Sequence, residues 1–457
     1  MRNGGTITEA VSSQVWSGEA AVHVSIVNWE KASPQTPGST RVPRVGEGVP
    51  PSRTSPDVPP AGDASPTPDV SGSAFRRDAE TNTRDACAPQ NRTCRLTFQR
   101  GDSVDSPWET FELPVINSSL SAGLDVGSAA ELAANQEPPC VYTGLYPRSD
   151  GFMISADEAA RMLRKDPRNR DVVWPFLVGR EFLEGETFDR WVIDFQKRDQ
   201  FAARSYAAPF AHVQTYVLPH ATELAEKEKA KTGKSTGQDQ GWLKTWWQHF
   251  RPREELIGRI NSASRYMVCS RVTKRPIFTF LSPAIRPGDA LSCFVLADDY
   301  SFGIIQSDLH WHWFRAKCSK LKGDFRYTPH SVFDTFPWPQ APTPRAVRAV
   351  ADAAVALRTL RHRLMTQHGY SLRALYRTLD DPGTNPLRDA HTALDTAVRA
   401  AYAFPPKADP LAALLALNQA CAAREKSGQP ITPPGLPLPD SERAAFITTD
   451  CITLTEP

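Results

Sequence analysis

Residues 264–339 read SRYMVCSRVTKRPIFTFLSPAIRPGDALSCFVLADDYSFGIIQSDLHWHWFRAKCSKLKGDFRYTPHSVFDTFPWP. This stretch mixes short β-rich runs, turn signals, paired basic residues and aromatic residues. It carries ten Lys/Arg against six Asp/Glu, a surplus of four positive charges in a chain whose net charge is only +2. Such a composition suits a surface that lies on a nucleic-acid backbone and reaches base edges. On charge alone, a solvated face without a polyanionic partner fits equally well.

Length and composition bound the classes of protein that the chain can belong to. Its 457 residues allow roughly two to four domains, and 40 prolines indicate that part of the chain is not packed. The eight cysteines show no Cys-x-x-Cys pair and no histidine at zinc-finger spacing, which predicts reduced thiols and no metal. No apolar run approaches the roughly 20 residues that cross a bilayer. We therefore expect a cytoplasmic protein without a membrane partner.

The N-terminal part changes character after about 30 residues. TITEAV and AAVHVSIVNW, within residues 6–28, predict two strands, the second apolar enough to be covered on both faces. Two strands alone cannot bury such faces, so the chain is expected to begin inside a domain. Residues 33–109 hold twelve prolines and no apolar periodicity, which predicts disorder in a linker or insertion.

Regular patterns return after about residue 110. Ser155 and Glu158 form a capping box for a helix in ADEAARMLRKD, and DVVWPFLVG and DRWVIDF are strand-like. Tryptophans in GWLKTWWQHF recur at helical spacing, more typical of a core than of a binding surface. After residue 340, three helical patterns predict a small packing bundle. The first of these helices is expected to be capped by Thr343.

Several motifs, in one order along the chain, resemble the MmeI-like DNA adenine methyltransferases, which are fused enzymes of restriction–modification systems. They are GGTITEAVSSQVWSGEAAVHVSIVNW, ANQEPPCVYTG, KDPRNRDVVWPFLVGREFL, RWVIDF, YMVCSRVTKRPIFTFLSP, DDYSFGIIQSDLHWHWF, FRYTPHSVFDTFPWP and NPLRDAHTALDTAVRAAY. The resemblance implies an α+β fold with five parts. These are the last strands of a Rossmann-like methyltransferase sheet (1–32), a disordered proline-rich insertion or linker (33–110), a mixed α/β target-recognition domain (111–339), a C-terminal helical domain (340–430) and a tail (431–457).

The chain departs from the family in its catalytic motifs. It has neither the glycine-rich loop that holds S-adenosylmethionine nor the Asn/Asp-Pro-Pro-aromatic loop that accepts from the target amino group. The resemblance thus implies the C-terminal portion of an enzyme that methylates the exocyclic amine of adenine. This chain alone is expected to bind no S-adenosylmethionine and to be inactive. The alternatives are a non-enzymatic specificity subunit, which docks onto a separate methyltransferase chain, and a non-functional remnant.

The resemblance and the chemistry of base recognition name candidate site residues. In the family an aromatic before the second strand stacks on a flipped adenine, and Trp16 occupies that position; a core tryptophan is the plainer interpretation. Arginine and lysine read guanine edges, whereas lysine and serine more often hold phosphates. The candidates for contacting double-stranded DNA are Arg271, Lys274, Arg275, Arg286, His310, Lys317, Ser319, Lys320, Lys322, Arg326 and Tyr327.

Two other patterns suggest metal or nuclease chemistry. His310 and His312 would share one face of a strand, but no third ligand is adjacent, which favours a structural pair. Asp298 and Asp299 could form a nuclease carboxylate pair, but the Asp, then Glu-x-Lys motif of this enzyme class is absent from the chain. We therefore predict neither a metal site nor DNA cleavage. The expected partners are double-stranded DNA and the missing catalytic portion on a separate chain.

Overall fold

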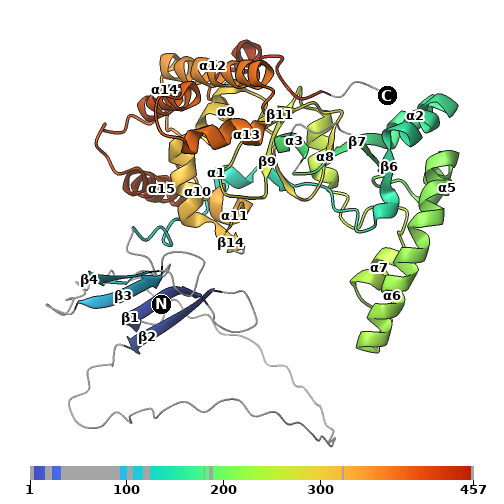
Figure 1. Ribbon diagram of the computed structural model, residues 1–457, viewed down its shortest axis with the longest axis horizontal. Helices are drawn as coiled ribbons and strands as arrows, with labels where there is room; N and C mark the ends of the chain where they lie inside the picture. Colours follow the sequence, from blue (N-terminus) through green and yellow to red (C-terminus); the bar gives the residue numbers. More distant parts are fainter. Residues whose placement is uncertain are drawn as a thin grey trace, which may run out of the picture. The chain divides into compact units, whose positions relative to one another are not determined.

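The computed structural model describes residues 5–15, 23–31, 93–99, 107–116, 124–179, 181–184, 189–321 and 324–453. These fall into two compact units, one within Met1–Ala122 and the other within Gly123–Pro457 (Figure 1). None of the helices in the described ranges combines the length and apolar character needed to cross a membrane.

The first unit is a four-stranded sheet in the order β2–β1–β3–β4. Its strands are β1 (Gly5–Val15), β2 (His23–Lys31), β3 (Cys94–Gln99) and β4 (Trp108–Leu113). β1 pairs antiparallel with β2 and parallel with β3, and β3 pairs antiparallel with β4. The two strands predicted within residues 6–28 are thereby confirmed.

The prediction of disorder across residues 33–110 is wrong where β3 and the start of β4 lie. Cys94 and Leu96 are buried and alternate with the exposed Arg95, the period of two expected of a half-buried strand. The strand has polar neighbours and gains its stability from pairing with β1, far away in sequence. The other residues between 32 and 106, and Trp16, lie outside the described residues.

The second unit contains three small sheets. The first, in the order β11–β9–β13–β5, is antiparallel and consists of β5 (Val141–Thr143), β9 (Tyr266–Ser270), β11 (Thr279–Leu281) and β13 (Leu291–Phe294). The second, in the order β12–β7–β8–β6, consists of β6 (Met153–Ser155), β7 (Val173–Leu177), β8 (Arg190–Ile193) and β12 (Arg286–Pro287). The third, in the order β10–β15–β14, consists of β10 (Val272–Thr273), β14 (Ser319–Leu321) and β15 (Asp324–Arg326).

Helices surround these sheets. Those before residue 340 are α1 (Ala133–Gln136), α2 (Ala156–Lys165), α3 (Glu181–Glu184), α4 (Gln200–Arg204), α5 (Ala207–Tyr216), α6 (Leu218–Thr232), α7 (Gln238–Leu243), α8 (Glu254–Asn261), α9 (Asp299–Gln306), α10 (Asp308–Lys317) and α11 (Pro329–Val332). Those after it are α12 (Pro344–His368), α13 (Leu372–Arg377), α14 (Pro386–Ala401), α15 (Pro410–Lys426) and α16 (Asp440–Arg443). Within this unit, Figure 1 shows α12 to α15 at one end and α5 to α7 at the other, with the sheets between them.

Local sequence signals set several helix ends as predicted. The Ser155 hydroxyl accepts from the Glu158 backbone N–H at 3.2 Å, and the Glu158 carboxylate accepts from the Ser155 N–H at 3.0 Å, which completes the capping box of α2. Thr343 caps α12 by accepting from the N–H of Ala346. The tryptophans of GWLKTWWQHF are core residues, since Trp242, Trp246 and Trp247 are all buried.

The segment HWHWF is helical, which corrects the prediction that His310 and His312 share a strand face. Ser307 caps α10 by accepting from the His310 N–H, so the segment begins one turn into a helix. Residues two apart on a helix point to nearly opposite sides. Accordingly, His310 is buried and His312 is partly exposed.

The C-terminal helices share one core with the domain before them. α9 is buried along its whole length, and α12 packs so close to Gly303 that a Cβ there would lie 2.6 Å from Val350 Cγ1. The last described residues return to the sheet, where Ile452 N–H donates to Phe280 O at 2.8 Å. The parts predicted as residues 111–339 and 340–430 therefore lie mostly within one compact unit.

Candidate nucleic-acid interface

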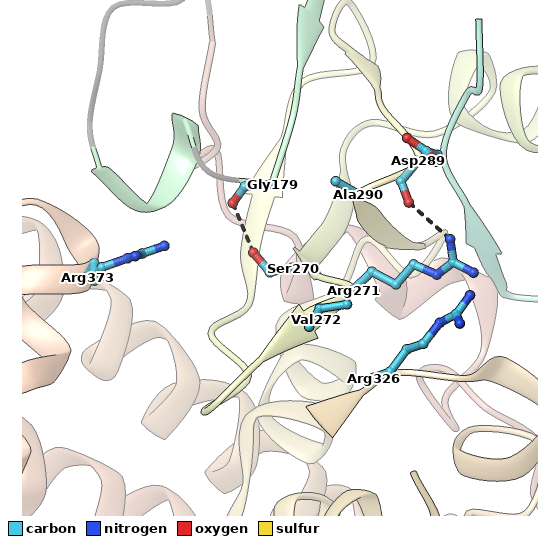
Figure 2. Close-up of a pocket in the computed structure, with 8 residues that line it drawn as sticks. All are labelled: Gly179, Ser270, Arg271, Val272, Asp289, Ala290, Arg326 and Arg373. Carbon is cyan, nitrogen blue, oxygen red and sulfur yellow. Dashed lines mark hydrogen bonds between the residues drawn. The ribbon is translucent and has the colours of Figure 1, made fainter. Parts of the chain in front are cut away.

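Two adjoining hollows flank strand β10. The first, of about 480 Å³, is lined by Arg271, Arg326, Asp289, Arg373 and four smaller residues, and we call it the arginine hollow (Figure 2). The second, of about 610 Å³, lies between β10 and α13, and we call it the α13 hollow. Ser270, Val272 and Arg373 line both, so the two hollows adjoin, and we call the pair the depression.

Strand pairing brings Arg271 and Arg326 together although 55 positions separate them in the sequence. Val272 in β10 lies opposite Arg326 in β15, and the Tyr327 N–H donates to Arg271 O at 2.8 Å. The Arg271 N–H in turn donates to Ala290 O at 2.8 Å. Figure 2 shows the two guanidinium groups extending in the same direction from neighbouring strands.

The arginine hollow concentrates positive charge. Burial lowers the pKa of Arg271, and repulsion from Arg326, Arg253 and Arg251 lowers it further, while Asp289 opposes them. Burial, then repulsion from Arg251, lowers the pKa of Arg253. The guanidinium groups of Arg326, Arg253 and Arg251 therefore all repel that of Arg271, while Asp289 attracts it. A bound polyanion would relieve this repulsion.

Arg251 and Arg253 are not among the DNA contacts predicted from the sequence, although Arg251-Pro252-Arg253 contains a recognisable pattern of two cations before a helix. These two cations precede α8, where the positive end of the helix dipole disfavours them. Arg253 also has left-handed backbone angles, with φ 51° and ψ 48°, and its buried Nε has no hydrogen-bond partner among the described residues. Unfavourable charge and backbone strain at one position are typical of functional sites.

The remaining basic candidates differ in how far their side chains are already hydrogen-bonded within the protein. Lys274 is exposed and lines the α13 hollow. Arg275 lines it too, but its guanidinium donates to Tyr376 O at 3.0 Å and to Asp380 Oδ1 at 3.1 Å. Lys317 lines neither hollow; its Nζ donates to Val126 O at 3.1 Å, and burial lowers its pKa.

Ser319 and Lys320 belong to β14, but nothing is described of their side chains. Lys322 lies outside the described residues.

Three of the predicted DNA contacts are interior groups, which corrects the sequence analysis. Arg286 is 2% exposed, stacks 3.7 Å from the Trp174 ring centroid and bonds to Asn261 Oδ1 at 3.1 Å. His310 Nε2 lies 3.1 Å from the Tyr327 hydroxyl, and both residues are buried. Burial lowers the pKa of His310 to about 3, so the ring is neutral. These side chains pack the core because α10 and the strands turn them inward.

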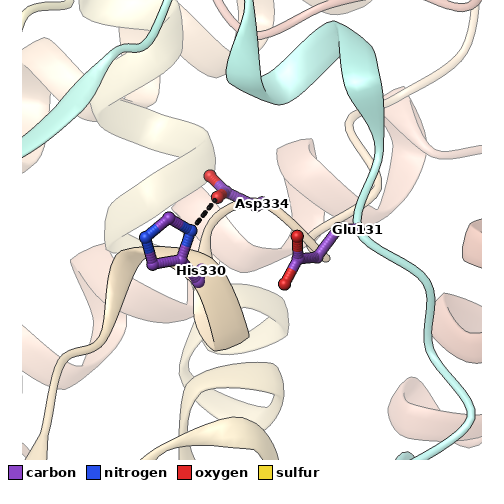
Figure 3. A group of neighbouring side chains, drawn as sticks. All are labelled: Glu131, His330 and Asp334. Atoms are coloured by element: carbon purple, nitrogen blue, oxygen red, sulfur yellow. Dashed lines mark hydrogen bonds and ion pairs between the residues drawn. The ribbon is translucent and has the colours of Figure 1, made fainter. Parts of the chain in front are cut away.

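One group of side chains has the composition of a metal site. Glu131, His330 and Asp334 each offer a ligand atom, and these atoms lie within 4.8 Å of one another (Figure 3). His330 Nδ1 lies 3.1 Å from Asp334 Oδ2, and Gln136 Nε2 donates to Glu131 Oε2 at 3.0 Å and to Asp334 Oδ2 at 3.4 Å. These hydrogen bonds hold the two carboxylates together without a cation, so we assign no metal here.

Comparison with known proteins finds a family match over most of the residues that line the arginine hollow. Residues 129–340 match the family of the MmeI target recognition domain. A stretch of 108 residues is 34% identical to DNA methyltransferase A of Bacillus subtilis (strain 168), covering 23% of this chain and 11% of that protein.

A solved structure shares the fold. It is the type IIL restriction-modification enzyme MmeI in complex with DNA, with a TM-score of 0.61 and 18% identity over 92% of this chain and 46% of that one. The mixed helices and small sheets agree with the predicted α+β class. The chain spans less than half the length of either relative. Residues 129–340 therefore match the MmeI target-recognition-domain family, and the chain resembles part of a restriction–modification DNA methyltransferase, as its motifs predicted.

Proposed function

We propose that this chain is the DNA-recognition portion of a site-specific DNA adenine methyltransferase from a restriction–modification or related defence system. The observation that carries the proposal is the arginine hollow, where the guanidinium groups of Arg271 and Arg326 extend from neighbouring strands beside Asp289 (Figure 2). The hollow lies mostly within the segment that matches a target recognition domain. A related enzyme of this fold has been solved in complex with DNA.

Arg271 and Arg326 are the side chains best placed to meet DNA. Each presents a planar fork of donors, which matches either guanine O6 and N7 or a phosphate. Burial raises the strength of such contacts because fewer waters screen them. Within the described part of the chain, the Arg271 guanidinium makes a 3.5 Å approach to Asp289 O, a long contact that it can exchange for DNA. Asp289 adds an acceptor of the kind that pairs with a base amino group.

The finer proposals follow the family resemblance. In the complete enzyme, S-adenosylmethionine would supply a methyl group for the exocyclic amine of adenine. Trp16 would stack on the extruded base, a contact that contributes about 1–3 kcal/mol. This chain alone would bind double-stranded DNA, bind no S-adenosylmethionine and transfer no methyl group. Purified chain incubated with labelled S-adenosylmethionine and a mixed-sequence duplex tests this, and methyl incorporation without a partner would overturn it.

The second candidate is a non-enzymatic specificity subunit that docks onto a separate methyltransferase chain. It is supported by the match of residues 129–340 to a target recognition domain, which is the part that such a subunit would supply. The two candidates differ in what lies beside the coding region. An adjoining frame with the glycine-rich and Asn-Pro-Pro-aromatic motifs indicates a divided enzyme, whereas a complete partner elsewhere indicates a subunit.

A selection from a random duplex library, followed by anisotropy titration of the enriched site, tests recognition itself. The double variant R271A/R326A should bind the selected site roughly 30-fold more weakly or worse, because each lost bidentate base contact costs about 1–3 kcal/mol. The matched control is R164A, an exposed arginine on α2 outside both hollows. No enrichment, or unchanged binding by a folded double variant, would contradict the proposal.

A further inference from the structure

We propose that helix α13, in the C-terminal helical part, is a second DNA-contacting element whose Arg373 and Arg377 hold backbone phosphates beside the arginine hollow. This inference rests on the proposed function, since it concerns the same bound DNA. It also changes the role of the C-terminal helices, whose apolar pattern predicted packing alone. Its basis is the shape of the depression, the charges that line it and the way in which α13 is fixed.

The two hollows of the depression adjoin, and α13 lines the second of them. Arg373 and Arg377 are four residues apart on α13, so they lie on the same face of the helix. Both line the α13 hollow, and Arg373 lines the arginine hollow as well. Figure 2 shows Arg373 on one side of Ser270 and Val272, and the Arg271 and Arg326 guanidinium groups on the other side, extending away from it. A polyanion that extends along both hollows would therefore meet Arg271 and Arg326 at one end and α13 at the other.

The charges of the α13 hollow leave a positive surplus after internal pairing. Arg275 pairs with Asp380 at 3.1 Å. Lys274 and Arg377 are exposed and form no salt bridge among the described residues, while Asp324 is the one remaining carboxylate in the lining.

The Arg373 guanidinium uses one of its nitrogen atoms in an ion pair within the described part of the protein. Its Nε bonds to Glu184 Oε1 at 3.0 Å, and its side chain is 40% exposed. That bond orients the guanidinium and leaves its two terminal amino groups available to a phosphate.

Contacts on two sides hold α13 in place. The Arg275 guanidinium donates to Tyr376 O at 3.0 Å, which ties α13 to the loop after β10. On the other side the Tyr376 hydroxyl contacts Arg361 of α12 and lies 3.0 Å from His391 Nε2 of α14. Arg275, predicted from the sequence to contact DNA, thus acts as a positioning residue. A helix fixed in this way offers its arginines without a backbone ordering cost on binding.

Phosphates fit this face better than bases do. Arg377 is exposed, and the Arg373 fork is already turned by Glu184, so neither faces a closed pocket that could select one base. Contacts to phosphates position a protein on DNA and carry no sequence information. They do carry salt dependence, because each neutralised phosphate releases counterions. Loss of the α13 contacts should therefore weaken all duplexes alike and flatten the dependence of binding on salt.

The test measures binding of the full chain to the selected site and to a scrambled duplex over a range of potassium chloride concentrations. R373A/R377A should flatten the slope of log K against log salt by about 1.8, since each phosphate contributes about 0.9. Affinity at about 0.1 M salt should fall between about tenfold and a hundredfold, by the same factor for both duplexes. R363A is the matched control, an exposed arginine on α12 that lines neither hollow.

The outcomes separate this inference from the proposed function. If the wild type binds through Arg271 and Arg326 but R373A/R377A keeps the wild-type slope, α13 does not contact DNA and the recognition proposal stands. If the double variant changes site preference, the phosphate assignment is wrong. If the wild type binds no duplex, both proposals fail. Should R373A/R377A not fold, the charge reversal R377E at an exposed position must still flatten the slope, and an unchanged slope overturns the inference.

Discussion

Replacement of Asp299 by asparagine should destabilise the second unit. Asp299 is 2% exposed and accepts from two buried arginines, with Arg265 Nη2 at 2.6 Å and Arg358 Nη2 in direct contact. The same two guanidinium groups reach Asp450, whose side chain is 49% exposed. Among the described residues, Asp299 is therefore the one fully buried counter-charge for two buried cations.

The magnitude follows from what the substitution leaves behind. Removal of one partner from a buried ion pair costs about 3–5 kcal/mol, because the other charge stays buried and unpaired. The asparagine amide could still accept one hydrogen bond, and Asp450 still opposes both arginines, so we expect the lower half of that range. With an unfolding entropy of about 2.1 cal/mol/K per residue, residues 123–457 give about 0.7 kcal/mol/K, and the loss corresponds to about 4–6 °C.

Differential scanning calorimetry of the full chain at neutral pH measures this shift. The control is D440N, which makes the same chemical change in an exposed pair, since the Asp440 side chain is 90% exposed and that of Arg443 is 57% exposed. Exposed pairs contribute little, so D440N should melt with the wild type. If D299N also melts within about 1 °C of the wild type, the buried network does not stabilise the unit and the reasoning fails.

Two further predictions concern pH and packing. Burial, then repulsion from Asp308, raises the pKa of Asp395 to about 7, so its contribution to stability is complete below about pH 4 and is lost as the pH rises through 7. In urea unfolding, the free energy of unfolding of D395N should equal that of the wild type at about pH 4 and exceed it by about 2 kcal/mol at about pH 8. This is half of the roughly 4 kcal/mol set by the pKa shift, because the Asp395 side chain is partly exposed. Parallel pH profiles of the two proteins would contradict this prediction. G303A should lower the free energy of unfolding by about 1–3 kcal/mol, because the added methyl group would overlap with α12. The control G258A lies in helix α8 with open space around it and should raise the free energy of unfolding by up to about 1 kcal/mol. Equal effects of the two variants in thermal unfolding would count against the close approach of α12 to Gly303.

The sequence by itself determined the features that depend on near neighbours. The capping box of Ser155 and Glu158 and the cap of α12 at Thr343 use groups three residues apart, so a short window contains both partners. A nearly continuous run of β-forming residues likewise predicted the strands of residues 6–28, and helical spacing predicted the buried tryptophans. Motif order was enough to predict the family of residues 129–340.

Only the tertiary structure decided which distant groups meet. β3 forms because β1 pairs with it, and the arginine hollow forms because β10 pairs with β15 and so brings Arg271 to Arg326. Burial likewise separated Arg286 and His310 from the exposed basic residues, although all share one basic stretch of sequence. Charge and residue type are properties of a position in the chain. The exposure of a side chain and the distance between two charges depend on contacts between segments that are far apart in the sequence. The binding energy of a surface depends on this exposure and on these distances.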